Sequence, residues 1–468
     1  MLENNCETRH ADKNRKHAGQ PSRGTVCAFT FSVILVALFP IRLAAQTTSS
    51  GTMAPGQASA LGTGVQTPLR FAGESESANQ VSLSIGASTF YDDNVLARNS
   101  NRVSDEALSF TSHLGIARET EHLTVNFDYN PFFQLYRQID QYDRLNHVAN
   151  LGLTYRLTSS FSLGLHDSFS YQNGIFPPLA GQQIMSGPAS PSALNQMIFS
   201  YTTRTLSNAP GMDLTFVKSR RTSLTLSGGY NQRQFGNQGG AGQALYNSRG
   251  VSGGVQFQYR VTDHTTLGLL LNHQDTTYQG SGAFGNRVST QIESPFLSVE
   301  SRLSPTVTVT VHGGPQYVRT LGGSGGAGTT ARLQGAGGGN ITKEVRKTAL
   351  TLSFQRSISD SGGLYTSVIN TNANFGVRRR LVGRWEANLR GGGARADASL
   401  FKLANGSTDA LTGGIDISRP VRGGSVFHLS YETTHELSKG TLPIAADFDR
   451  NQVTIGFDYR LKTLSLGR

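Results

Sequence analysis

The stretch Leu151–Tyr171, LGLTYRLTSSFSLGLHDSFSY, decides the fold. Apolar residues occupy every second position on both sides of a polar break at Thr158-Ser159-Ser160, and small or polar residues fill the positions between. Because side chains alternate across a strand, this pattern predicts a β-hairpin with one apolar and one polar face. The apolar face needs a cover, which is either a second protein layer or the acyl chains of a membrane. Its members are Leu151, Leu153, Tyr155, Leu157, Phe161, Leu163 and Leu165.

The composition favours the membrane. Only 37% of the 468 residues are hydrophobic, which is low for a soluble chain of this length. A barrel needs an apolar layer only one side chain deep, so a low fraction suits it. After residue 45, no stretch approaches the roughly 20 apolar residues of a transmembrane helix. The sequence therefore predicts a transmembrane β-barrel whose polar residues face the lumen.

Residues 1–45 have the pattern of a secretory signal peptide. Basic residues precede an apolar run from Val26 to Phe39, and Leu43-Ala44-Ala45 offers a cleavage site. The alternative is a single anchoring helix. Both cysteines, Cys6 and Cys27, leave with this segment, so backbone pairing rather than disulfides must hold the exported chain. Residues 46–78, rich in Gly, Ser, Thr, Ala and Pro, are expected to be a flexible periplasmic linker, and residues 79–468 the barrel.

The hairpin pattern repeats to the C-terminus. Apolar alternation returns about 18 times, with 16 as the next likeliest count, and long connections alternate with short ones, as in bacterial outer-membrane barrels. The connection 172–195 is long, whereas 218–221 is a tight turn. The segment from Met197 to Val217 is interrupted at Ala209-Pro210-Gly211, so it is either one kinked strand or two short ones. The sequence thus predicts an antiparallel up-and-down barrel of 16–18 strands.

Two features test this pattern. Asp167 falls on the lipid-facing parity of the first hairpin, where a bulge or a position at the membrane rim would accommodate it. Aromatic residues recur near strand ends, which fits the aromatic girdles of a membrane barrel, although aromatics favour ordinary strands as well. These aromatics are Tyr155, Tyr171, Phe257, Tyr259, Phe457 and Tyr459.

Two short stretches carry a family resemblance. After the first predicted strand, Tyr91, Asp92, Asp93 and Asn94 follow Phe90, and this stretch resembles the Tyr-Asp-Asp-Asn sequence of a little-characterised group of β-barrel porin-like bacterial outer-membrane proteins. The final strand, 453–459, resembles their closing strand. Some members are encoded with exopolysaccharide or PEP-CTERM sorting clusters. The resemblance implies a location and an architecture rather than a substrate. One departure is that residues 461–468 follow Tyr459, whereas such barrels commonly end on an aromatic residue read by the assembly machinery.

Motifs for catalysis or cofactor binding are scarce. Residues 323–328 match GxGxxG, but nothing helical follows, so a flexible loop is expected there rather than a nucleotide site. His435-Glu436 does not extend to the HExxH of zinc proteases, because position 439 is Lys. Asp92 and Asp93 are either Ca²⁺ ligands in an external loop or solvated turn residues. We therefore expect no catalytic centre, no cofactor and no metal site.

The net charge of +11 gives the only hint of a solute. Rings of Arg or Lys favour anions in a pore, so lumen cations predict a preference for small anionic solutes or acidic polysaccharide. The alternative is that these cations pair with lumen carboxylates or lie at the periplasmic rim. Nucleic acid is a poor partner for an exported chain with dispersed cations. The candidate cations are Arg156 and Arg204 on polar parities, and Arg378, Arg379, Arg380, Arg384 and Arg390 around one turn.

The sequence thus predicts an outer-membrane barrel that acts as a passive, porin-like conduit or as the outer-membrane part of a surface polysaccharide system. An occluded structural or adhesive barrel that acts through its external loops is the second hypothesis, and a barrel enzyme is the third. The expected partners are outer-membrane lipid, the barrel assembly machinery, and a polysaccharide or small anionic solute.

Overall fold

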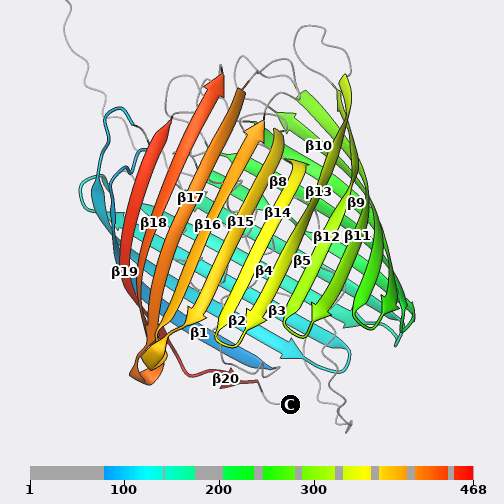
Figure 1. The fold of residues 1–468 in the computed structure, drawn as a ribbon, viewed down its shortest axis with the longest axis horizontal. Helices are drawn as coiled ribbons and strands as arrows, with labels where there is room; N and C mark the ends of the chain where they lie inside the picture. Colours follow the sequence, from blue (N-terminus) through cyan, green and yellow to red (C-terminus); the bar gives the residue numbers. More distant parts are fainter. Residues whose placement is uncertain are drawn as a thin grey trace, which may run out of the picture. The chain divides into compact units, whose positions relative to one another are not determined.

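Backbone pairing closes the chain into one continuous antiparallel wall (Figure 1). The computed structural model describes residues 79–97, 99–140, 143–173, 204–236, 246–279, 287–321, 330–359, 368–397, 406–440 and 447–466. The predicted signal peptide and linker, most of the 172–195 connection and the GxGxxG stretch lie outside these residues.

Long strands make up nearly all of the wall, joined by two short 3-10 turns and by loops. The first ten strands are β1 (Gln80–Asp92), β2 (Asp105–Glu119), β3 (Leu123–Tyr136), β4 (Arg144–Arg156), β5 (Phe161–Asn173), β6 (Arg204–Asn208), β7 (Gly211–Ser219), β8 (Thr222–Phe235), β9 (Asn247–Thr262) and β10 (Thr265–Gln279). The remaining elements are β11 (Arg287–Ser304), β12 (Val307–Leu321), β13 (Thr330–Val345), β14 (Thr348–Ser359), β15 (Val368–Arg380), η3 (Val382–Arg384), β16 (Glu386–Asp397), β17 (Gly406–Pro420), η4 (Arg422–Gly424), β18 (Ser425–Gly440), β19 (Phe448–Arg460) and β20 (Leu464–Ser465).

Each strand pairs with its neighbours in sequence, and the first strand also pairs with the last long one. The register of that closing pair runs from Ser84↔Arg460 to Asp92↔Gln452. Because β1 also pairs with β2, the wall has no free edge. The predicted up-and-down barrel is therefore confirmed, and its strand number is 18.

The count of 18 depends on the interrupted segment. Both β6 and β7 pair with β5 on one side and with β8 on the other, so together they fill one position. Between them, the N–H of Ala209 still donates to Ser168, whereas Pro210 has no N–H to donate. Of the two predicted alternatives, one kinked strand or two short ones, the structure shows β6 and β7 as one strand with a break.

The two ends of the barrel differ in their connections. Turns of two to five residues join β2 to β3, β4 to β5 and so on around one end, which we call the short-turn end. Connections of seven residues or more join the strands at the other end, which we call the loop end. In outer-membrane barrels the short turns are periplasmic. The strand β20 lies at the short-turn end, where Leu464 pairs with Val81 and Ser465 with Gln80 at the start of β1.

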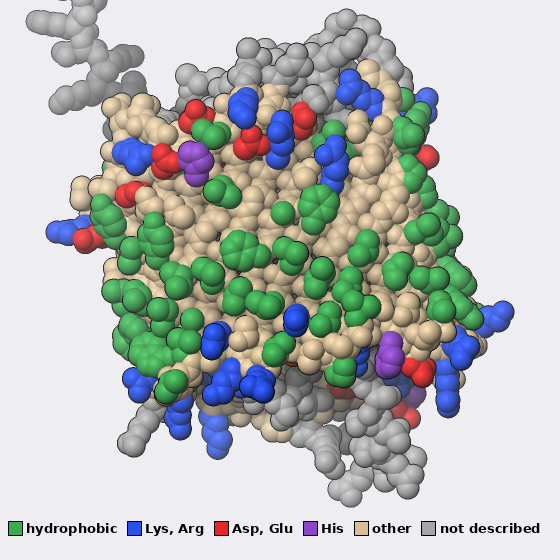
Figure 2. All heavy atoms as spheres, viewed as in Figure 1, with side chains coloured by type: hydrophobic (Ala, Val, Ile, Leu, Met, Phe, Trp, Pro, Cys, Tyr) green, Lys and Arg blue, Asp and Glu red, His purple; other side chains and the backbone are tan. Residues whose placement is uncertain are grey.

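Alternation along the strands places apolar side chains on the outside. Leu151, Tyr155 and Leu165 of the first hairpin are 38%, 47% and 44% exposed, as the lipid-facing hypothesis requires. On the face seen in Figure 2, apolar side chains form a belt across the wall, and most charged side chains lie above and below it. Asp167 keeps the outward parity opposite Leu151, and it lies beside the break between β6 and β7.

Among the residues that the structure describes, no helix is long and apolar enough to cross a membrane.

The belt predicts a dependence of stability on depth in the bilayer. Leu352 on β14 is 53% exposed in the middle of the belt, so Leu352→Arg should lower the free energy of unfolding by about 2–4 kcal/mol. Leu303 is 69% exposed next to a short turn, and Leu303→Arg should cost no more than about 1 kcal/mol. Urea unfolding in lipid vesicles measures both values. Equal costs at the two positions would contradict a lipid-facing belt.

Candidate functional site: the lumen wall and the closing seam

The inner face of the barrel is polar. On β15, Asn370, Asn372 and Asn374 point inward and are almost fully buried, whereas Ala373 and Phe375 between and beyond them point outward and are exposed. Strand geometry forces this division, because successive side chains point to opposite faces. The other strands alternate inward and outward side chains in the same way. We call the surface formed by all the inward side chains the lumen wall.

Opposite charges meet on the lumen wall. Arg390 on β16 donates to the Glu432 carboxylate on β18, and each of these side chains is 9% exposed. Nearer the short turns, Arg378 Nε lies 3.9 Å from Glu386 Oε1. Each guanidinium thus has a carboxylate beside it, which lowers its attraction for a passing anion.

Three inward His–Asp pairs line the half of the wall nearest the short turns. The ring nitrogens of His113, His166 and His428 lie 3.1, 3.4 and 3.2 Å from an aspartate oxygen on the next strand. The partners are Asp128 on β3, Asp213 on β7 and Asp458 on β19.

Two of the pairs, those of His166 and His428, share one geometry. His166 lies directly opposite Gly211, and His428 directly opposite Gly456; each aspartate follows two residues after that glycine. A Cβ on Gly211 would come within 2.3 Å of the His166 ring, and a Cβ on Gly456 within 2.3 Å of the His428 ring. Glycine therefore makes room for the imidazole, and the diagonal position on the same strand supplies the carboxylate.

The stretch Tyr91-Asp92-Asp93-Asn94 lies where β1 meets β19 at the loop end. Asp92 is fully buried and accepts hydrogen bonds from the Arg450 guanidinium, with Nε at 2.9 Å. Its second oxygen accepts from the Asn94 N–H at 3.0 Å. Because a buried carboxylate is costly without a partner, Arg450 fixes the position of the last strand against the first.

The next two residues extend this junction, which we call the closing seam. The two oxygens of Asp93 accept from the backbone N–H and the side-chain amide of Asn451 at 2.6 and 2.7 Å. Asn94 Nδ2 donates to the Asp449 carbonyl at 2.8 Å. The side chains of three consecutive residues therefore bind the same segment of β19.

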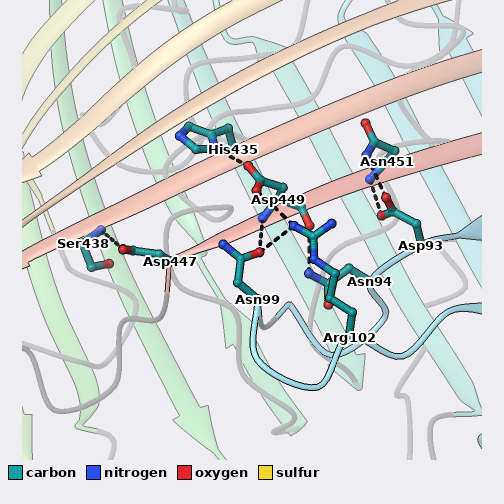
Figure 3. Close-up of polar contacts among 9 residues, drawn as sticks. All are labelled: Asp93, Asn94, Asn99, Arg102, His435, Ser438, Asp447, Asp449 and Asn451. Atoms are coloured by element: carbon teal, nitrogen blue, oxygen red, sulfur yellow. Dashed lines mark hydrogen bonds and ion pairs between the residues drawn. The ribbon is translucent and has the colours of Figure 1, made fainter.

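Residues after the stretch bind that segment as well (Figure 3). Asn99 Oδ1 accepts from the Asp449 N–H at 3.0 Å and from Arg102 at 2.8 Å, and Arg102 also donates to the Asp449 carboxylate at 3.0 Å. On the other side, His435 of β18 contacts the same carboxylate. Asp449 thus joins the β1–β2 connection, β18 and β19.

The structure separates the cations that the sequence grouped. Arg390 lies on the lumen wall, paired with Glu432, whereas Arg380 and Arg384 lie at the short-turn end, the latter with φ of 72° in η3. Arg378 faces inward beside Glu386, and its neighbour Arg379 faces outward. Arg156 ends β4 at the short-turn end, on the inward parity and exposed. These positions match the paired or rim alternative more closely than a ring of free cations.

The prediction that Arg204 lies on a polar parity was wrong. Arg204 shares the outward parity of Leu206, which pairs with Tyr171 on the outer face of β5. It is exposed at the loop end of β6. The error arose because only one apolar residue marks the parity of this five-residue strand.

Both predicted roles of Asp92 were also wrong. This residue is neither solvated nor available to a cation, since its oxygens bind Arg450 and the Asn94 N–H. Within the described ranges, no group of three His, Cys, Asp or Glu side chains could hold a metal ion.

Sequence reasoning missed the carboxylates and histidines of the lumen wall. A signal was present in the repeated pattern glycine, apolar residue, aspartate, because its first and third positions face inward together. Each copy has a basic residue opposite its glycine on the preceding strand, namely His166, Arg390 or His428. The copies are Gly211-Met212-Asp213, Gly414-Ile415-Asp416 and Gly456-Phe457-Asp458.

A closed 18-stranded wall with an apolar belt outside and a polar face inside defines an outer-membrane β-barrel protein. Its place is the outer membrane of a bacterial cell.

No family model matches the chain, and no curated protein matches it. Among solved structures, Pseudomonas aeruginosa OccK11 (OpdR) is similar at 17% identity and a TM-score of 0.39, over 82% of this chain and 98% of that one. P. aeruginosa OccK2 (OpdF) in complex with glucuronate has 14% identity and a TM-score of 0.43, over 82% and 100%. The FrpB iron transporter from Neisseria meningitidis has 8% identity and a TM-score of 0.41, over 82% and 83%.

The closing seam predicts where stability is concentrated. Asp92→Asn removes the carboxylate that binds the buried Arg450 guanidinium, so the free energy of unfolding should fall by about 3–5 kcal/mol. The compact band on an unheated SDS gel should be lost at a correspondingly lower temperature. Arg137→Gln is the matched control, because Arg137 and Glu106 form a pair at the same end that is 71% and 58% exposed. A control variant as unstable as Asp92→Asn would show that burial at the seam is not the cause.

Proposed function

We propose that this protein is a porin-like passive conduit for small hydrophilic solutes across the outer membrane. The observation that carries the proposal is the combination of 18 strands with a polar lumen wall. Barrels of 16–18 strands are wide enough to leave an aqueous channel, whereas eight-stranded barrels fill their interior with side chains. A polar inner face lets water and solutes occupy such a channel.

The charges of the lumen wall support a weakly selective conduit. Arg390 and Arg378 each lie beside a carboxylate, and Arg450 is held by Asp92. A strong preference for anions requires cations that face the solute without such partners. The proposed conduit therefore excludes few solutes by charge alone.

The amide side chains of the wall make its inner face polar without adding charge. Asn370, Asn372 and Asn374 form a row along β15, with Asn388 on the next strand, and all four are almost fully buried in the wall. A neutral polar wall suits a conduit for uncharged hydrophilic solutes. A role in surface or exopolysaccharide export is the specific form of the conduit that we propose, because the Tyr91–Asn94 stretch resembles porin-like proteins that are in part encoded with exopolysaccharide clusters.

Planar-bilayer recording of the purified full chain tests the proposal. A conduit should give steady, voltage-tolerant conductance steps, and vesicles that contain it should swell in small neutral sugars. A barrel that inserts but gives neither signal would overturn the proposal in favour of the occluded structural or adhesive barrel. Hydrolysis assays on lipids and peptides test the enzyme hypothesis in the same preparation.

Ion preference should respond to the Arg390–Glu432 pair. Glu432→Gln removes the carboxylate and leaves the guanidinium to passing ions, so the reversal potential under a KCl gradient should move towards that of chloride. The double variant Arg390→Gln and Glu432→Gln removes both charges and should return the potential to that of the unaltered protein. An unshifted potential in Glu432→Gln would show that the pair does not act on the permeating ions. A shift that persists in the double variant would show that the charge of Arg390 is not its cause.

A further inference from the structure

The three His–Asp pairs are regularly spaced around the lumen wall. Counting along the paired strands, His428 on β18, His113 on β2 and His166 on β5 lie three strands apart in each step. In each pair the aspartate lies diagonally from the histidine, one step nearer the short turns. One arc of the wall therefore carries three copies of the same titratable unit.

We infer that these three pairs determine the ion preference of the conduit and make it depend on pH. This inference rests on the proposed function, since it concerns which ions pass through the same lumen. The residues assigned are the histidines His113, His166 and His428 and their partners Asp128, Asp213 and Asp458.

The charge change follows from the chemistry of the pair. Above the range in which imidazole titrates, each histidine is neutral and each ionised aspartate contributes one negative charge to the wall. Below that range, the protonated imidazole cancels the charge of its aspartate. The arc thus favours cations at high pH and loses three negative charges as the pH falls. The Arg390–Glu432 pair beside this arc carries opposite charges and does not offset the change.

The residues that face each histidine from the neighbouring strands do not cancel this change in charge. His428 faces Asp458 from β19 at 3.2 Å, and Asp416 lies one inward position away on β17. The closest register partner from β17 is Ser418, which carries no charge.

The other two histidines have simpler surroundings. His166 faces Gly152 and Asn150 from β4 and Asp213 from β7. His113 faces Ser84 from β1, across which lies Arg460, and Asp128 from β3. At both sites the carboxylate is the charged group within 3.5 Å of the ring.

Access to protons differs among the pairs. The side chains of His166 and Asp213 are 38% and 22% exposed, whereas His428 is 8% exposed against its glycine. His166 should therefore exchange protons with the lumen water most readily, and it offers the safest single substitution.

The reversal potential of the full chain in a planar bilayer under a KCl gradient tests the inference at pH 8 and at pH 5, which bracket histidine titration. The unaltered protein should prefer cations at pH 8 and shift towards anions at pH 5. The triple variant H113Q, H166Q and H428Q keeps a hydrogen-bonding side chain at each site but cannot titrate there, so it should lose most of the shift. The inward His312 on β12, which faces Ser298 and Gly338, remains in this variant and accounts for the rest. The control H273Q removes an exposed histidine from the outer face and should shift as the unaltered protein does.

The outcomes separate the two proposals. A protein that inserts without conductance overturns the proposed function. A conducting protein whose potential is the same at both pH values, or whose triple variant shifts as far as the unaltered protein, overturns this inference alone. Where the triple variant does not give a compact band on an unheated gel, H166Q replaces it and should remove roughly a third of the shift, since distant sites add. An unchanged shift in H166Q would likewise overturn the inference.

Discussion

A strand in hydrocarbon finds no water for its N–H and C=O groups, so the first and last strands of a membrane sheet must pair with each other. In this protein that requirement falls on β1 and β19. The pairings around the rest of the wall join strands close in sequence, but Asp92 and Arg450 are 358 positions apart. Closing such a long loop costs more conformational entropy than forming a hairpin. The densest polar network in the described part of the chain lies at this junction, where Asp92, Asp93 and Asn94 bind one segment of β19.

The architecture was predictable because the two faces of each strand meet different solvents. Leu151, Tyr155 and Leu165 alternate with polar residues in the sequence, and the same residues are exposed on the outer face of the structure. The break at Ala209-Pro210 was visible as well, since proline cannot donate to a sheet. Parity failed only where the strand was short and weakly patterned, as at Arg204. Alternation is thus reliable in proportion to the number of apolar residues that define it.

Pairing between distant residues was not predictable in the same way. Asp92 and Asp93 follow a strand in the sequence and therefore resembled turn residues, yet burial against β19 makes them partners of Arg450 and Asn451. The His–Asp pairs depend on register, because a shift by one residue would turn every side chain to the other face. The pattern of glycine, apolar residue and aspartate marks the carboxylate, but only the neighbouring strand supplies the histidine. Membership of the porin-like group that the Tyr91–Asn94 stretch resembles stays a prediction.

The junction between β1 and β19 is also held at the short-turn end, where β20 follows β19 and pairs with the start of β1. Leu464 pairs with Val81, and the Leu466 N–H donates to the Asn79 carbonyl at 2.9 Å. The side chains of Asp92, Asp93 and Asn94 bind β19 at the loop end of the same junction. To open laterally between β1 and β19, the barrel would have to break the closing seam, the β1–β20 pairing and the backbone hydrogen bonds between β1 and β19 together. In the proposed conduit, solutes would therefore pass along the barrel axis, because this junction gives an apolar molecule no lateral exit into the bilayer.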